Sequence, residues 1–120
     1  MTEKKNADHN IGHLGLEEIV HITNKVGLDY VNAKKRADHL SLLKASRRPQ
    51  VMLRLEDGKL SEAKLQRLAD TDPEYLEFLE ELTEAKRESE RLKVRYDSYR
   101  NLFEAKRSIL SYQKAEMSIL

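Results

Sequence analysis

The chain has 120 residues, of which 36% are charged and 39% hydrophobic, with four glycines, two prolines and no cysteine. This composition is typical of long helices, and the lack of cysteine excludes disulfides, thiolate nucleophiles and sulfur-ligated metal sites. No apolar run reaches the roughly 18 residues of a membrane span, and the first ten residues lack the apolar stretch of a signal peptide. We therefore expect a single-domain cytoplasmic protein that does not bind membranes.

The net charge of +1 conceals a segregated distribution of charge along the chain. Residues 34–54 carry seven basic side chains against one acid, whereas residues 60–82 carry seven acids and two bases. Residues 83–120 carry nine bases and six acids. A charged partner would therefore meet separate basic and acidic regions of the chain.

A first helical arm is predicted from about residue 16 to residue 56, after a polar flexible tail at residues 1–14. Gly27 interrupts the hydrophobic spacing, either as the residue that ends a helix or as a weak point inside a longer one. Pro49 is expected to kink or end the helix. The segment after it, residues 50–56, fits a resumed helix or a short strand, and we favour helix because no partner strand is visible.

A turn and a short helix are predicted at residues 57–70, followed by a long helix at about 73–118. Asp57 and Gly58 mark the turn, and Ser61 is a candidate N-cap of the short helix. Asp72 followed by Pro73 is a strong signal for the start of the long helix. Neither glycine nor proline occurs after Pro73, so one uninterrupted helix is expected.

Hydrophobic residues recur at positions a and d of a single heptad register along the long helix, which predicts packing in a left-handed supercoil. This heptad seam consists of Tyr75, Phe78, Leu82, Ala85, Leu92, Tyr96, Tyr99, Phe103, Leu110, Met117 and Leu120. Three further a or d positions are polar. One hairpin buries little of this surface, so self-association is expected. The predicted fold is all-α, an extended antiparallel helical hairpin assembled into a homo-oligomer.

Position e of the same register is basic in five successive heptads. This basic row consists of Lys86, Lys93, Arg100, Arg107 and Lys114. Such residues either pair with acids of a neighbouring helix or bind the phosphates of a nucleic acid without reading its sequence. The first arm offers few acids, chiefly Asp29 and Asp38, which favours phosphate. The neighbouring aromatics Tyr96, Tyr99 and Phe103 lie in the seam, which favours a core role over base stacking.

A second group of basic residues surrounds Pro49. This basic cluster consists of Lys44, Arg47, Arg48 and Arg54. It is either a solvated bend, in which the long side chains cover helix surface, or a second set of phosphate contacts. The acidic stretch at residues 60–82 is a candidate surface for a protein partner.

The sequence contains none of the signatures of an enzyme. There is no phosphate-binding loop, no dinucleotide fingerprint and no grouping of serine, histidine and acid. His9 and His13 could lie four residues apart on a helix, but we interpret them as tail residues and expect no metal site. We therefore predict a protein without catalytic residues or cofactors.

The segment SEAKLQRLADTDPEYLEFL resembles the UvsY-type recombination mediators of large tailed phages. The shared pattern, S-E-x-K-x-x-x-x-A-D-x-D, is met by Ser61, Glu62, Lys64, Ala69, Asp70 and Asp72. The pieces LEEI, LDYVNA and MLRLE are similarly placed. After MLRLE the family continues with a longer lysine-rich stretch, whereas this chain turns, so no site residues are carried over from the family.

The resemblance implies a helical homo-oligomer that binds single-stranded DNA without sequence preference, in the host cytoplasm if a phage encodes it. Such proteins contact a recombinase and a single-strand-binding protein, and they help the first displace the second from DNA. A recombination accessory factor is thus the leading hypothesis. The alternatives are a structural coiled-coil adaptor that binds no nucleic acid, and a small phage inhibitor of a host protein.

Overall fold

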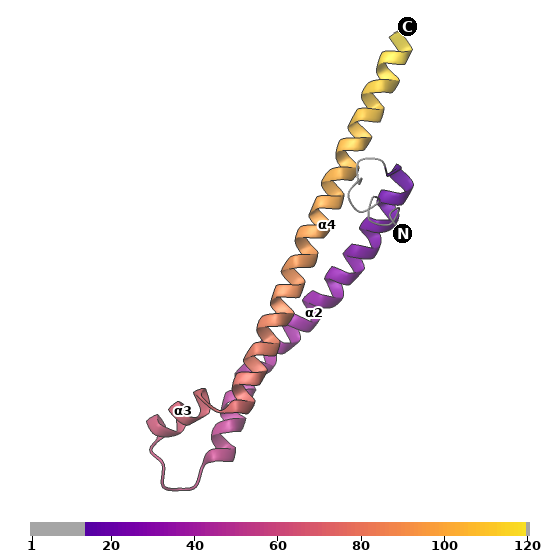
Figure 1. The fold of residues 1–120 in the computed structure, drawn as a ribbon. Helices are drawn as coiled ribbons and strands as arrows, with labels where there is room; N and C mark the ends of the chain where they lie inside the picture. Colours follow the sequence, from indigo (N-terminus) through magenta and orange to yellow (C-terminus); the bar gives the residue numbers. More distant parts are fainter. Residues whose placement is uncertain (1–13, 120) are drawn as a thin grey trace, which may run out of the picture. The chain divides into compact units, whose positions relative to one another are not determined.

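The computed structural model describes residues 14–119, and within them every regular element is a helix (Figure 1). The helices are α2 (Leu16–Leu55), α3 (Glu62–Asp70) and α4 (Pro73–Ile119). The predicted all-α fold, with a long C-terminal helix that includes the heptad seam, is therefore confirmed. Most of the predicted tail, with His9 and His13, and Leu120 of the seam lie outside the described residues.

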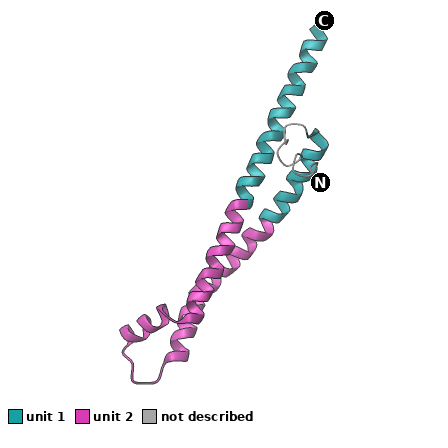
Figure 2. Ribbon diagram, in the orientation of Figure 1, with its two compact units in different colours: residues 1–30, 92–120 teal, residues 31–91 magenta. Residues whose placement is uncertain are grey.

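The chain forms two compact units (Figure 2). Unit 1 comprises residues 1–30 and 92–120, and unit 2 comprises residues 31–91. In each unit a segment of α2 runs antiparallel to a segment of α4, and α3 belongs to unit 2 (Figure 2). Each unit therefore contains a pair of antiparallel helix segments.

Helix α2 continues through both residues that are expected to interrupt it. Gly27 lies inside the helix and is half-buried. Pro49 also lies inside, and the helix ends six residues later at Leu55, so the segment after the proline is helical as favoured. Because proline has no N–H, the carbonyl of Ala45 loses its donor in the helical ladder.

The predicted start signals of α3 and α4 are confirmed. Ser61 is extended, with φ −68° and ψ 156°, and its hydroxyl accepts a hydrogen bond of 3.2 Å from the Lys64 N–H. The Asp72 carboxylate accepts hydrogen bonds from the N–H groups of Glu74 and Tyr75, at 3.1 and 3.2 Å. These side chains satisfy donors that have no partner within the helix. In the preceding turn, Gly58 has a φ of 79°, a conformation that glycine adopts without strain.

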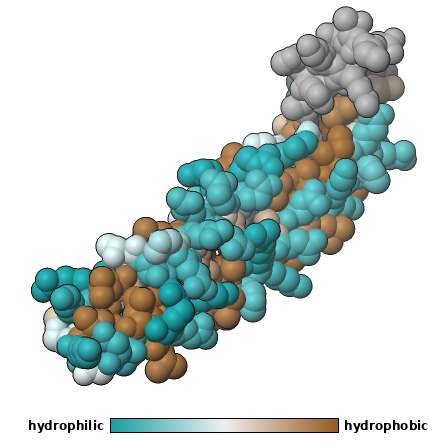
Figure 3. All heavy atoms as spheres, turned by 60° about the horizontal axis from the view of Figure 1, so that its bottom comes forward, coloured by the Kyte–Doolittle hydropathy of each residue, from teal (hydrophilic) through white to brown (hydrophobic). Residues whose placement is uncertain are grey.

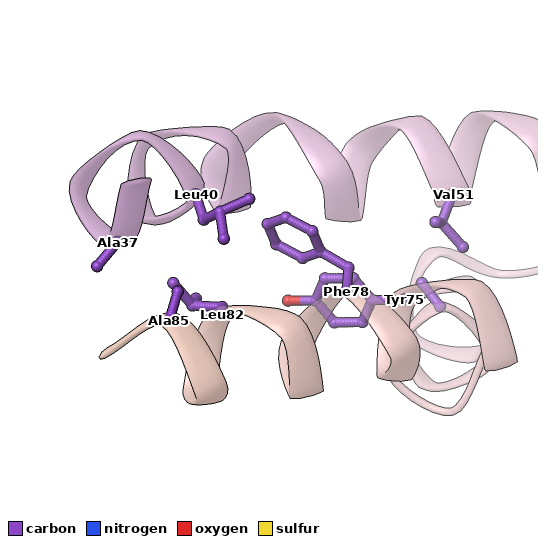
Figure 4. Close-up of a cluster of buried hydrophobic side chains, with 8 residues drawn as sticks. Ala37, Leu40, Val51, Tyr75, Phe78, Leu82 and Ala85 are labelled. Atoms are coloured by element: carbon purple, nitrogen blue, oxygen red, sulfur yellow. The ribbon is translucent and has the colours of Figure 1, made fainter. Parts of the chain in front are cut away.

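The hydrophobic core of unit 2 lies between α2 and α4 (Figure 4). Phe78 points from α4 toward α2, and the buried residues of the cluster come from both helices and, in the case of Ala69, from α3. The cluster consists of Ala37, Leu40, Val51, Ala69, Tyr75, Phe78, Leu82 and Ala85. Four of these eight are a or d residues of the heptad seam, so in unit 2 the seam packs inside the chain.

In unit 1 the ring of Tyr96 lies against the backbone of Gly27. A Cβ atom added at Gly27 would lie 3.0 Å from Cε2 of Tyr96, which is closer than ordinary van der Waals contact. The same ring stacks on Tyr30, with 6.4 Å between centroids and 25° between planes. Gly27 is thus a point of close approach between the two helices. The low helix propensity of glycine reduces the stability of α2 at this position, but the absence of a side chain makes the close approach possible.

We expect Gly27→Leu to destabilise the protein by about 1–3 kcal/mol, because the added side chain must displace Tyr96. The measurement is the free energy of unfolding from urea denaturation. In a Tyr96→Ala background the same substitution should lose this penalty and gain from the better helix propensity of leucine. An equal cost in both backgrounds would contradict the close approach.

Candidate nucleic-acid interface

The basic row lies on the solvent-exposed surface of α4. Four members, Lys93, Arg100, Arg107 and Lys114, belong to unit 1, and all four are exposed. They recur every seven residues over 21 residues of helix, which corresponds to about 32 Å. The fifth, Lys86, is exposed on α4 in unit 2.

The row residues differ in their contacts within the chain. The Arg100 guanidinium lies 5.6 Å from the ring centroid of Tyr96, and Arg107 forms a 2.9 Å ion pair with Glu104 one turn away. Within residues 14–119, Lys93 and Lys114 form no ion pair. Ion pairs between exposed residues contribute little free energy, so the Glu104 contact leaves Arg107 able to exchange partners.

The aromatic seam residues of unit 1 contact other side chains of the two helices. Tyr96, Tyr99 and Phe103 are all half-buried. Tyr96 stacks on Tyr30, and the Arg95 guanidinium covers the Tyr99 ring at 5.9 Å. These contacts support the packing interpretation over base stacking.

Toward the end of α4 the seam residues become exposed to solvent. Its members up to Leu92, apart from the polar position at Ser89, are buried, whereas Leu110 is 49% and Met117 75% exposed. Ile109 beside them is also exposed, at 55%. Hydrophobic atoms are visible between hydrophilic side chains on the surface shown in Figure 3. The end of α4 therefore presents an apolar stripe that no described part of the chain covers.

The basic cluster is largely engaged by side chains of unit 2. Nε of Arg48 lies 2.8 Å from Asp70 Oδ1, and Nη2 lies 3.1 Å from Oδ2, a two-point contact. Arg54 Nη2 lies 2.7 Å from Asp72 and 3.4 Å from Glu74.

The other two members of the cluster differ from each other. The Arg47 guanidinium lies 5.3 Å from the centroid of the Phe78 ring, over the core. Lys44 is exposed and forms no ion pair within residues 14–119. The cluster is therefore mainly an intramolecular contact between α2 and the acidic stretch, and Lys44 alone extends freely to solvent.

The paired carboxylates of unit 2 are held in their charged form. The hydrogen bond from Arg48 lowers the pKa of Asp70, and the hydrogen bond from Arg54 lowers the pKa of Asp72, which is only 8% exposed. The hydrogen bond from Arg91 likewise lowers the pKa of Glu88. Each carboxylate therefore releases its proton more readily in the folded chain than in the unfolded one.

We expect the free energy of unfolding to be nearly constant above about pH 5 and to fall as the pH drops through about 4. The sign follows because the folded pKa values are lowered, so the unfolded chain binds more protons in this range. The measurement is urea denaturation between pH 7 and pH 3. Asp72→Asn keeps a capping oxygen but not the charge, so the fall should be shallower in this variant. If the free energy of unfolding falls as steeply with pH in Asp72→Asn as in the wild-type chain, the Asp72 carboxylate does not contribute to the pH dependence.

Two other kinds of site are not found in the described part of the chain. Within residues 14–119, no three histidine or carboxylate side chains gather closely enough to hold a metal ion. None of the helices α2 to α4 is sufficiently long and apolar to cross a membrane. The surface depressions between α2 and α4 in unit 2 are open and lined by charged residues.

Comparison of the chain with known proteins finds no relative. No protein-family model matches it, and no curated protein or solved structure shows significant similarity. The resemblance to UvsY-type mediators therefore stays a prediction.

Proposed function

We propose that the protein binds single-stranded DNA through the basic row of α4 and acts as a recombination accessory factor that helps to load a recombinase. The observation that carries the proposal is the exposure of Lys93, Arg100, Arg107 and Lys114 at regular spacing along one helix. A row of cations without an apolar pocket suits the phosphate backbone, which has regular charge and demands no base recognition. Displacement of a single-strand-binding protein in favour of a recombinase rests on the family resemblance alone.

The apolar stripe at the end of α4 supports self-association. Leu110 and Met117 occupy a positions of the seam, and no described residue covers them. If several subunits pair there, their basic rows bind one strand together, and the avidity exceeds that of one row. Lys44 adds a further positive charge on α2, whereas Arg48 and Arg54 would have to leave their carboxylates to reach a phosphate.

The proposal is tested by titrating fluorescently labelled oligo-dT with the full chain and recording anisotropy at several salt concentrations. Four phosphate contacts predict a slope of log K against log salt of about −3, because each contact contributes about −0.7 on single strands. Affinity should thus fall about 50-fold between 50 and 200 mM salt. The absence of binding at low salt would refute the proposal.

A structural coiled-coil adaptor is the second candidate, and the same apolar stripe favours it. On this hypothesis the basic row pairs with acids of a partner helix, and no nucleic acid binds. Sedimentation of the full chain distinguishes the two functions. A charge reversal in the row that changes oligomer mass supports the adaptor, and one that changes only DNA affinity supports the accessory factor.

A further inference from the structure

The face of α2 that points away from the core of unit 2 carries exposed leucines. Leu40 and Val51 of α2 belong to the core and point toward α4 (Figure 4). Leu42 and Leu53 each follow one of them by two residues, which is about 200° round a helix. Their side chains are 77% and 79% exposed, although the solvent face of a surface helix is normally polar. Both leucines therefore project from unit 2 into solvent.

Smaller apolar residues connect the two leucines into one row. This outer row consists of Leu42, Ala45, Pro49 and Leu53, and all four are exposed. Their intervals of three, four and four residues keep them on one helix face over about 17 Å. The charged residues of the same stretch are the four members of the basic cluster, and they lie at least about 100° away round the helix. The outer row is thus an uncharged apolar surface in a chain of which 36% of the residues are charged.

The pattern of the outer row is almost the same in both chain directions. A leucine lies at each end, and alanine and proline lie between them. A second copy of the chain, turned by 180°, would therefore place its Leu53 on Leu42 and its Leu42 on Leu53. This self-complementarity is what a twofold interface requires. The small side chains in the middle of the row allow two helices to approach closely.

The charges that continue the row toward the start of α2 favour antiparallel over parallel helices. Lys35 and Asp38 lie seven and four residues before Leu42, on the same face, and both are exposed. In a parallel pair each would lie beside its own copy, and such like-charge contacts are unfavourable. In an antiparallel pair that joins Leu42 to Leu53, both lie beyond the end of the second α2, which stops at Leu55.

We infer that a second copy of the chain docks on the outer row, with the two α2 helices antiparallel and the twofold axis level with residues 47 and 48. The row is short, and interfaces below about 1,200 Å² are typical of weak contacts. We therefore expect a dimer that forms only at high protein concentration. The contact lies in unit 2 and requires neither DNA nor the apolar stripe of α4. A chain with two separate self-contacts can assemble beyond a dimer.

The test is sedimentation equilibrium of the full chain without DNA, at protein concentrations up to the millimolar range. The background chain carries Leu110→Glu and Met117→Glu, which remove association through the apolar stripe. In this background we expect a monomer–dimer equilibrium, and Leu42→Glu should weaken it at least about tenfold. Leu28→Glu is the matched control, because Leu28 is a 67% exposed leucine of α2 in unit 1, and it should leave the Kd unchanged.

Cross-linking of cysteine variants tests the direction of the helices, because the chain has no cysteine of its own. Ser46 is exposed beside the outer row near the twofold axis, so Ser46→Cys should form covalent dimers with a short bismaleimide. Leu42→Cys alone should not, since its copy lies about 17 Å away along the helix axis. An equimolar mixture of Leu42→Cys and Leu53→Cys should again form dimers.

Three results would overturn the inference. If the background chain stays monomeric at every concentration, no second copy binds the outer row. If Leu42→Glu and Leu28→Glu weaken the dimer equally, the contact is not at the row. If Leu42→Cys forms cross-links with itself, the helices are not antiparallel. Sedimentation is measured without DNA, so these results are independent of whether the chain binds oligo-dT.

Discussion

The triple variant Lys93→Glu, Arg100→Glu and Lys114→Glu is expected to bind oligo-dT at least about 100-fold more weakly than the wild-type chain at 0.1 M salt. Three lost phosphate contacts, each contributing about 0.7 to the salt exponent, account for a factor of about 10² at this concentration. The salt slope should become shallower by about 2. The three side chains are exposed, so the fold should be retained. Anisotropy titrations at several salt concentrations measure both quantities.

The matched control is Lys35→Glu, Lys59→Glu and Lys64→Glu, three exposed lysines outside the row. Each replacement lowers the net charge by two, so both triple variants change it from +1 to −5. If affinity depends only on net charge, the two variants will lose equal affinity, and the row is then not the binding site. Sedimentation of both variants must show the wild-type oligomer mass, because a change in mass would itself alter the affinity.

Much of the fold follows from local rules that act within a few residues. Ser61 and Asp72 cap their helices as predicted, because a short polar side chain at that position satisfies N–H groups that the helix leaves free. The seam residues Phe78 and Leu82 are buried as their heptad positions require. That α2 continues through Pro49 was less predictable. The helix tolerates the lost hydrogen bond because it packs against α4 on both sides of the proline.

The role of the basic cluster depends on contacts between distant residues. The sequence shows Arg48 and Arg54 as unpaired positive charges, whereas the structure places them beside Asp70 and Asp72, which are 22 and 18 residues away. One signal was available in the sequence: a basic segment and an acidic segment of similar length flank the predicted turn, so a hairpin brings them together. The burial of Tyr75 follows from its a position in the heptad seam, whereas the residues of α2 that it meets have no such signal, because they depend on the rotation of α4 against α2.

The exposed end of the seam shows what the heptad pattern cannot predict. The heptad spacing is as regular at Leu110 and Met117 as at Leu82, yet only Leu82 is covered within the chain. A heptad pattern states that a helix needs a partner, but it does not identify the partner. Packing inside unit 2 accounts for the first part of the seam, and the last part is what the proposed self-association would use.

Phe78→Ala is expected to lower the free energy of unfolding by about 3–5 kcal/mol, the largest stability effect we predict for a single substitution. Phe78 is 6% exposed and points from α4 into the core of unit 2, where α2 supplies Leu40 and Val51 (Figure 4). Removal of the ring leaves a cavity that two helices cannot close without shifting, and it removes the surface beneath the Arg47 guanidinium. Urea denaturation followed by circular dichroism measures the loss.

Leu76→Ala is the matched control, because Leu76 lies two residues earlier on the same helix and is 45% exposed. Leu76→Ala should lower the free energy of unfolding by well below 1 kcal/mol, because it removes only surface packing. Phe78→Leu, which retains most of the apolar volume, should fall between the two. A chain of this size has a total stability of about 5–15 kcal/mol, so Phe78→Ala brings unit 2 close to unfolding. If Phe78→Ala and Leu76→Ala cost the same, the packing of α4 on α2 cannot be what stabilises unit 2, and the arginine–carboxylate contacts of the basic cluster must then hold the two helices together.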